Sequence, residues 1–166
     1  MSGFGCRILA SDIRENPSLK GLCTYVDNET LYKECDIISL HMPLLDSTRH
    51  FVNAETIAKM KDGVTIINCA RGELMNIPDM IRGIETQKIG ALALDVFDKE
   101  DGIYHENRRD DILSNRDMAY LRQFPNVIMT QHMAFYTDAA VQSMVFCGVE
   151  GLCDFAKTGH TATELV

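Results

Sequence analysis

Polar and ionisable residues follow five apolar runs of this sequence, at the point where each run ends. They are Asp12, the segment His41-Met42-Pro43, the segment Cys69-Ala70-Arg71-Gly72, Asp95 and the pair Gln131-His132. Arginine is suited to bidentate binding of carboxylates, and histidine to acid–base chemistry near neutral pH. If the apolar runs are parallel strands, ligands bind beyond their carboxyl ends. The spacing therefore predicts a ligand site spread over several loops.

Each of these residues also has an ordinary structural explanation. An arginine after a strand, such as Arg71, is usually solvated or ion-paired, and a lone histidine such as His132 is more often a satisfied structural residue. Glu100 lies in the charged stretch Lys99–Arg116, which is typical of solvated surface. Asp12 could cap a turn, and Pro43 could simply end a strand.

The elements that must position these residues alternate along the chain. Apolar runs predict strands and 3.6-residue patterns predict helices. Strands are expected at Cys6–Asp12, Leu22–Val26, Asp36–His41, Val64–Cys69, Ile89–Phe97 and Val127–Gln131. Helices are expected at Asn28–Cys35, Asn53–Lys59, Pro78–Gln87 and Thr137–Lys157, with helical stretches in Asp110–Gln123. Strands without polar alternation, separated by helices, indicate an α/β fold with a doubly wound parallel sheet.

Composition narrows the class of protein. The chain has 166 residues, the size of one domain, and a formal net charge of −8 that argues against nucleic acid and anionic membrane as partners. No signal peptide or apolar run of membrane-spanning length is evident. The six cysteines form no CxxC pair, so we expect reduced core residues of a cytoplasmic protein, with neither metal nor disulfide.

Several blocks in a fixed order resemble one family. INCARGELMN, ALALDVFDKED and NVIMTQHMAFYTDAAV, with HMPLLDSTRHFVNAETIAKMKDG before them, are similar to the C-terminal half of D-isomer-specific 2-hydroxyacid dehydrogenases of the D-lactate and D-2-hydroxyisocaproate type. The resemblance runs from about Gly3 to about Gly159. It implies a Rossmann-like NAD-binding domain over residues 1–159 and a C-terminal tail over residues 160–166.

The resemblance also implies catalytic roles for three residues. Arg71 would clamp the substrate carboxylate and polarise the keto oxygen. His132 would protonate that oxygen as general acid, and Glu100 would hydrogen-bond His132 and favour its protonated form.

Contacts with an NAD cofactor carry over in the same way. Asp12 matches the acidic residue that binds the adenosine ribose, where a carboxylate favours NAD over NADP. The other positions that match cofactor contacts are His41, Met42, Pro43, Cys69, Ala70 and Asp95.

Family members are roughly twice this length, as two-domain proteins are. The resemblance therefore implies that the N-terminal substrate domain, the first strand of the cofactor domain, its glycine loop and most of the following helix are absent. Gly3-Phe4-Gly5 then matches the end of that helix, because the strand Cys6–Asp12 follows it. In the strand order 3-2-1-4-5-6, the first strand lies between Cys6–Asp12 and Asp36–His41. We expect those two edges to pair with each other or with a second copy of the chain.

Two functions follow from these observations. The first is NAD-dependent reduction of a small 2-keto acid to a D-2-hydroxy acid, by a homo-oligomer such as a dimer, with uncertain activity for this chain alone. The alternative is a catalytically inactive remnant that acts as an oligomerising or binding module. The keto acid itself is not identifiable from the sequence.

Overall fold

A computed structural model describes residues 1–105, 107 and 115–162. The chain divides into two units, Met1–Gln131 and His132–Val166, and each is described by itself. The predicted helical stretch at Asp110–Gln123 and the predicted tail over residues 160–166 each lie partly outside the described residues.

The N-terminal part of the first unit forms a small parallel sheet of two short strands. Strand β1 (Leu9–Ala10) pairs with β2 (Thr24–Tyr25), through the Thr24 amide donating to Ile8 O and the Val26 amide donating to Ala10 O, both at 2.9 Å. The 3₁₀ turns η1 (Ser2–Phe4) and η2 (Pro17–Leu19) precede and connect them. Gly5 ends η1 with φ 68°, a left-handed conformation that glycine adopts without strain. The glycines at the start of the chain therefore end a helical turn, in agreement with the sequence interpretation.

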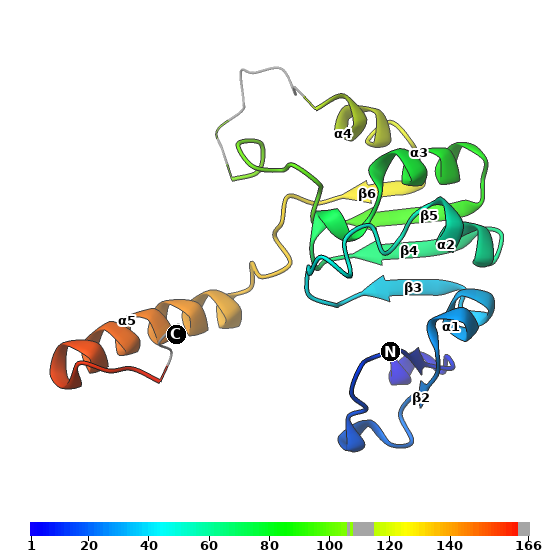
Figure 1. The fold of residues 1–166 in the computed structure, drawn as a ribbon. Helices are drawn as coiled ribbons and strands as arrows, with labels where there is room; N and C mark the ends of the chain where they lie inside the picture. The colour runs from blue at the N-terminus through cyan, green and yellow to red at the C-terminus, as the bar shows by residue number, and fades with distance from the viewer. Residues whose placement is uncertain (106, 108–114, 163–166) are drawn as a thin grey trace. The chain divides into compact units, whose positions relative to one another are not determined.

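Four parallel strands form the main sheet, in the order β3-β4-β5-β6 (Figure 1). Their bounds are β3 Ile37–Leu40, β4 Val64–Asn68, β5 Ile89–Leu94 and β6 Val127–Met129. Each strand is shorter than the apolar run that predicts it, because the residues at the carboxyl ends leave the ladder and enter loops. These loops all lie at the carboxyl ends of the parallel strands, as the sequence predicted.

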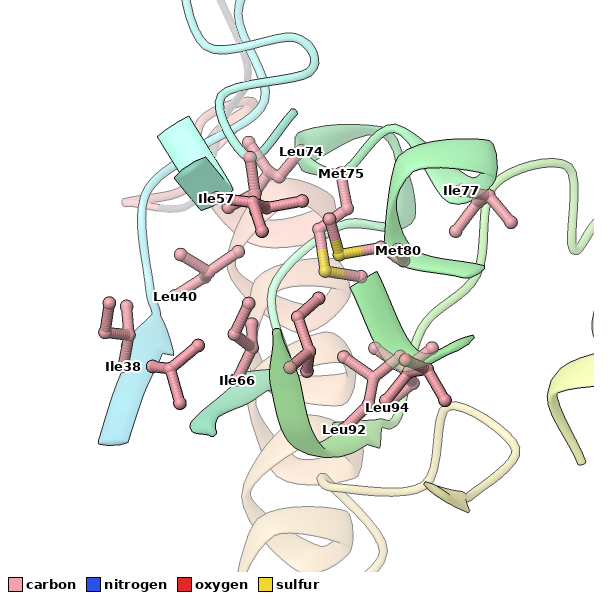
Figure 2. Packing of buried hydrophobic residues seen from close by; sticks show 14 of the residues in the cluster. Ile38, Leu40, Ile57, Ile66, Leu74, Met75, Ile77, Met80, Leu92 and Leu94 are labelled. Carbon is pink, nitrogen blue, oxygen red and sulfur yellow. The ribbon is translucent and has the colours of Figure 1, made fainter. Parts of the chain in front are cut away.

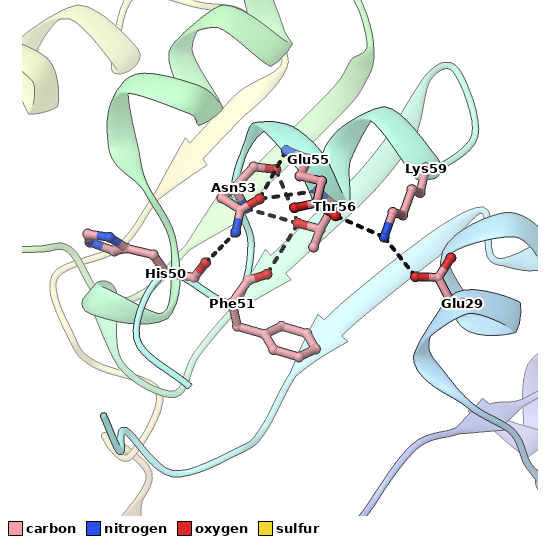
Figure 3. Close-up of polar contacts among 7 residues, drawn as sticks. All are labelled: Glu29, His50, Phe51, Asn53, Glu55, Thr56 and Lys59. Carbon is pink, nitrogen blue, oxygen red and sulfur yellow. Dashed lines mark hydrogen bonds and ion pairs between the residues drawn. The ribbon is translucent and has the colours of Figure 1, made fainter. Parts of the chain in front are cut away.

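Helices connect the strands, and capping residues define where they begin. They are α1 Asn28–Glu34, α2 Ala54–Lys59, the 3₁₀ turn η3 Gly72–Leu74, α3 Ile77–Glu85 and α4 Arg116–Leu121. Figure 3 shows the start of α2, where Asn53 Oδ1 accepts from the amides of Glu55 and Thr56, and Thr56 Oγ1 accepts from the Asn53 amide. Lys59 at the other end of α2 bonds Glu29 of α1 at 2.8 Å.

The hydrophobic core lies between one face of the four-stranded sheet and these helices (Figure 2). Ile38, Leu40, Ile66, Leu92 and Leu94 point into it from the strands and are at most 5% exposed. Buried side chains from the helices pack against them, among them Tyr32, Ile57, Ile77, Met80, Ile84, Met118 and Leu121.

The opposite face of the same sheet is not covered to the same degree. The ladder register places Ser39, Ile67, Ala93 and Ile128 in one row across it. Ile37 and Ile128 are 52% and 66% exposed, and Ile67 and Ala93 are half-buried. A parallel sheet is ordinarily covered on both faces, so this open face is unusual.

The second unit contains one long helix, α5 (Asp138–Thr158), which starts at the cap Thr137 and ends at Gly159 with φ 75°. Six of its large apolar side chains are more than half exposed: Met144, Val145, Phe146, Val149, Leu152 and Phe155. Within the described residues, α5 is the one helix long and apolar enough to cross a membrane, by length and composition alone. The charged residues Glu150 and Asp154 interrupt the apolar sequence of this helix.

Two sequence expectations are wrong. The expectation that the cysteines are core residues is wrong for most of them: Cys6, Cys69, Cys147 and Cys153 are exposed, and Cys23 is half-buried, whereas Cys35 is half-buried and packs against the core. One of the two pairings expected for the edges of β1 and β3 is also wrong: in the described part of the chain β1 pairs only with β2 and β3 only with β4, so these edges do not pair with each other. Their pairing with a second copy of the chain stays a prediction. The parallel α/β architecture itself is as predicted.

Candidate functional site

Asn68 organises the loop that follows β4. Its side chain is fully buried, its Nδ2 donates to Arg71 O at 2.8 Å, and its Oδ1 accepts from the Ala70 amide at 3.0 Å. A buried carboxamide that satisfies two backbone groups fixes the path of residues 68–71. Asn68 therefore determines where the Arg71 side chain leaves the sheet.

Arg71 itself is exposed at the carboxyl end of β4. Its Nη1 donates to Ala70 O at 2.7 Å, so the guanidinium is held close to its own main chain. A guanidinium carries five N–H donors, and the remaining ones are available to a planar carboxylate.

The loop after β5 is packed directly on the loop after β4 through Gly72. A Cβ atom at Gly72 would lie 2.1 Å from Phe97 C and 2.3 Å from the amide nitrogen of Asp98, both backbone atoms. Only glycine allows this approach. Glu100 Oε2 in turn accepts from the Phe97 amide at 2.7 Å. The structure thus brings the loop of Arg71 and the loop of Glu100 together.

Asp95 joins the ends of three strands. It is only 4% exposed, its amide donates to Asn68 O of β4 at 3.0 Å, and its Oδ1 accepts from Thr130 Oγ1 just beyond β6. Asp95 also acts on a neighbouring thiol. Desolvation and, to a smaller degree, the Asp95 charge raise the pKa of Cys69 above its usual value, so that this thiol is protonated at neutral pH.

The predicted cofactor loop after β3 is ordered by its own polar contacts. His41 Nε2 lies 2.8 Å from Ser39 Oγ, and Thr48 Oγ1 donates to Pro43 O at 2.8 Å. His41 and Pro43 are exposed at the carboxyl end of β3, and Met42 is half-buried against the core.

Asp12 lies just beyond β1, in the small sheet rather than the main one. Its Oδ1 accepts from the Arg14 amide at 3.0 Å, which is the turn cap that the sequence allowed. The side chain is exposed, and a carboxylate with one backbone contact retains acceptor capacity for a hydroxyl group.

His132 is the first residue of the second unit and is half-buried. Its φ of 54° is left-handed, which is uncommon outside glycine and is typical of a residue held by its surroundings. Beyond it, Thr137 Oγ1 accepts from the Ala140 amide at the start of α5.

Seven of the ten predicted site residues therefore lie at the carboxyl ends of the strands of the main sheet. They are His41, Met42, Pro43, Cys69, Ala70, Arg71 and Asp95, with Glu100 in the adjoining loop. Asp12 follows β1, and His132 begins the second unit. Sequence reasoning missed Asn68 and Thr130, which hold these strand ends together, because a polar residue at the end of an apolar run gives no sign of its partners.

A recess of about 700 Å³ lies elsewhere in the first unit. The loop Phe97–Ile103 and the starts of α3 and α4 line it, and none of the predicted site residues does. Its acidic and basic side chains, among them Asp98, Lys99 and Arg116, are mixed in sign and indicate no ligand class.

Comparison with known families gives a match to one family model. Residues 1–134 match the model described as D-isomer specific 2-hydroxyacid dehydrogenase, NAD binding domain. This match covers both sheets and all the predicted site residues.

Comparison with known proteins agrees with that match. The chain is 43% identical over 166 residues to an aromatic 2-oxoacid reductase from Clostridium sporogenes, covering 99% of this chain and 50% of the relative. It is 37% identical to a D-lactate dehydrogenase from Curvularia clavata, covering 100% and 48%. The NAD-complexed D-isomer specific 2-hydroxyacid dehydrogenase from Lactobacillus delbrueckii ssp. bulgaricus superposes with a TM-score of 0.90 at 32% identity, covering 98% and 49%. The chain thus spans about half the length of the relatives that it matches.

Proposed function

Because this chain belongs to the D-isomer specific 2-hydroxyacid dehydrogenase family, we propose that it serves NAD-dependent reduction of a small 2-keto acid to the D-2-hydroxy acid. One observation carries this proposal. At the carboxyl ends of β4 and β5, Arg71, Asp95 and Glu100 lie on loops that are in direct backbone contact. Family membership weighs against the alternative of a module without catalytic function.

The residues present fit the two ends of an NAD molecule. The exposed Asp12 carboxylate suits hydroxyl groups of the adenosine ribose and would repel a 2′-phosphate. Cys69, Ala70 and Asp95 suit the nicotinamide end, where Asp95, held by Thr130, presents a fixed carboxylate to a carboxamide. NADH, when bound, supplies the hydride for the reduction.

The protein side chains provide binding and proton transfer. Arg71 binds the substrate carboxylate through a planar pair of N–H donors, which also draws electron density from the adjacent keto oxygen. His132 donates a proton to that oxygen as the alcohol forms, since histidine exchanges protons near neutral pH. Glu100 is the carboxylate among the three proposed catalytic residues, Arg71, Glu100 and His132.

A titration with NADH tests the proposal. Nicotinamide fluorescence is followed with the purified chain, and reduction of pyruvate, 2-ketoisocaproate and phenylpyruvate is followed at the NADH absorbance. We expect saturable binding, with NADH preferred over NADPH by about tenfold or more, and loss of that preference in Asp12→Ser. Equal binding of both nucleotides by the parent chain would contradict the role of Asp12.

A matched pair of variants tests the role of Arg71. Arg71→Gln should retain NADH binding and lose keto-acid binding, because only the bidentate donor is removed. Arg122→Gln, which removes the same charge from an exposed position at the end of α4, should change neither. If Arg71→Gln bound keto acids as tightly as the parent, Arg71 would not be the carboxylate ligand.

We also propose a cytoplasmic location and a homo-oligomer, such as a dimer. The thiol state of all six cysteines supports the location, because reducing compartments preserve free thiols. The exposed apolar side chains of α5 support self-association, because such patches on soluble proteins ordinarily mark interfaces.

A further inference from the structure

Ser39 is the polar residue of strand β3 and lies on the open face of the main sheet. Its neighbours Ile38 and Leu40 point into the core, and side chains two residues apart on a strand lie on the same face. His41 follows Ser39 by two residues and emerges on the same side, where its Nε2 lies 2.8 Å from Ser39 Oγ. Both side chains are exposed, so this hydrogen bond forms although water could satisfy either group.

The contact with Ser39 is the one hydrogen bond that the His41 ring makes to any of the described residues. A serine hydroxyl rotates to donate or to accept, and a neutral imidazole carries its single proton on either of its two nitrogens. Where the hydroxyl donates to Nε2, the proton of the ring is on Nδ1. The contact therefore acts on two properties of His41, the orientation of its ring and its tautomer.

His41 lies beside residues that are proposed to contact the cofactor. The last ladder pair of β3 and β4 is Leu40 with Asn68, so that His41 and Cys69 follow it as neighbours on the two strands. Phosphate oxygens, such as those of NAD, accept hydrogen bonds, so a histidine binds them through an N–H group. Ser39 already occupies Nε2, and Nδ1 is the nitrogen left for a ligand.

We propose that Ser39 is a positioning residue for the cofactor. Its hydroxyl donates to Nε2 of His41, holds the ring in the Nδ1–H tautomer, and so presents an N–H donor to a phosphate oxygen of NAD. A neutral ring with its proton on Nε2 would instead turn a lone pair toward that oxygen. The inference rests on the proposed function, because it requires NAD to lie along the loop after β3.

Nitrogen NMR of the imidazole rings tests the tautomer without any nucleotide. Spectra of the full 166-residue chain with isotope-labelled histidine are recorded at about pH 9, so that an ordinary imidazole is neutral. The signals of His41 are assigned by their loss in His41→Phe. We expect a protonated Nδ1 and an unprotonated Nε2 in the parent chain, and a mixture of both tautomers in Ser39→Ala.

Fluorescence titration with NADH tests the consequence for binding. Ser39→Ala should weaken NADH binding by about three- to tenfold, which is the effect of one hydrogen bond. Ser39→Thr keeps the hydroxyl and should retain both the affinity and the tautomer of the parent chain. In the His41→Phe background, Ser39→Ala should have no further effect, because the group through which Ser39 acts is gone.

Thr86→Val is the matched control. It also removes one exposed hydroxyl, which donates to Arg82 O at 2.8 Å in the connection between α3 and β5, at the amino ends of the strands. This change should leave both the NADH affinity and the His41 tautomer as they are in the parent chain.

Three results would overturn the inference and leave the proposed function standing. One is a parent chain in which His41 carries its proton on Nε2. Another is equal NADH affinity in the parent chain and in Ser39→Ala. The third is a loss of affinity from Ser39→Ala that is the same with and without the His41 imidazole. A parent chain that binds no NADH would instead contradict the proposed function and, with it, this role of Ser39. The NMR spectrum of the unsubstituted chain decides the tautomer even if Ser39→Ala does not fold.

Discussion

At the scale of single residues, the site depends on groups that touch backbone rather than ligand. Asn68 fixes Ala70 and Arg71, and Thr130 holds the carboxylate of Asp95. The sequence could indicate Arg71 and Asp95, because their types and their place after apolar runs are unusual. It could not indicate Thr130 as the support of Asp95, because a hydrogen bond between residues 35 positions apart exists only after folding. The bonds of Asn68 are local, but their formation depends on the burial of its side chain, which the sequence does not give.

Asn68→Asp tests the support of Arg71. The change keeps the shape but removes the donor to Arg71 O and buries a carboxylate, which should cost roughly 2–4 kcal/mol of unfolding free energy at pH 7. The deficit should narrow in acid, where a protonated carboxyl can donate again. Urea unfolding measures it, with Asn115→Asp as control, because that side chain caps α4 only as an acceptor. Equal losses in both variants would refute a special role for Asn68.

Tyr104 provides a second prediction at this scale. Burial, and next the charge of Glu100, raise the pKa of its phenol from 10.0 to about 12. The folded state therefore favours the neutral phenol, so the free energy of unfolding should fall as pH rises above about 10 toward 12. Ultraviolet titration should lose a late-ionising tyrosine in Tyr104→Phe, whereas Tyr136→Phe serves as the control for removal of an exposed phenol hydroxyl. A Tyr104→Phe titration without that loss would contradict the assignment.

At the scale of elements, the close approach of the loops after β4 and β5 positions the candidate site more than any single side-chain contact does. Gly72 lies against the backbone of Phe97 and Asp98, so the loops after β4 and β5 are packed backbone to backbone. This backbone contact places Arg71 and Glu100 on adjoining loops.

Gly72→Ala tests this packing. Because a Cβ there would meet backbone at 2.1 Å, the loops must separate, at a cost of roughly 2–4 kcal/mol of stability and with loss of keto-acid binding. Gly3→Ala is the matched control in the same unit, since a Cβ there meets nothing within 4 Å and should change the stability by less than about 0.5 kcal/mol. Urea unfolding of both variants compares the two sites, and a Gly72→Ala protein as stable as the parent would exclude the close approach.

At the scale of the whole molecule, apolar side chains are exposed on both units, Ile37 and Ile128 on the main sheet of the first and six residues on α5 of the second. The open face of the main sheet belongs to the first unit, and the exposed side chains of α5 belong to the second. On α5, Val145, Gly148, Leu152 and Phe155 recur at spacings of three and four residues, as in helices that pair along one stripe.

The stripe of α5 leads to a prediction about assembly. Sedimentation should show concentration-dependent self-association that Leu152→Glu abolishes, because the charge would be buried between helices. Lys157→Glu, a charge change outside the stripe, should leave it intact. Association that survives Leu152→Glu would place the interface elsewhere, and binding of the parent chain to neutral lipid vesicles would favour a membrane instead.

The sequence by itself determined the parallel α/β class, the order of the strands and helices, the family, and NAD as its cofactor, because apolar runs, caps and motif blocks are local features. The functional roles of Arg71, Glu100 and His132 stay predictions. Only the tertiary structure decided that β1 and β3 do not pair with each other, that most of the cysteines are not core residues, and that one face of the sheet is open. The physical reason is that pairing and burial depend on which segments meet in space, and a strand pattern in sequence is the same whether its edge is paired or free.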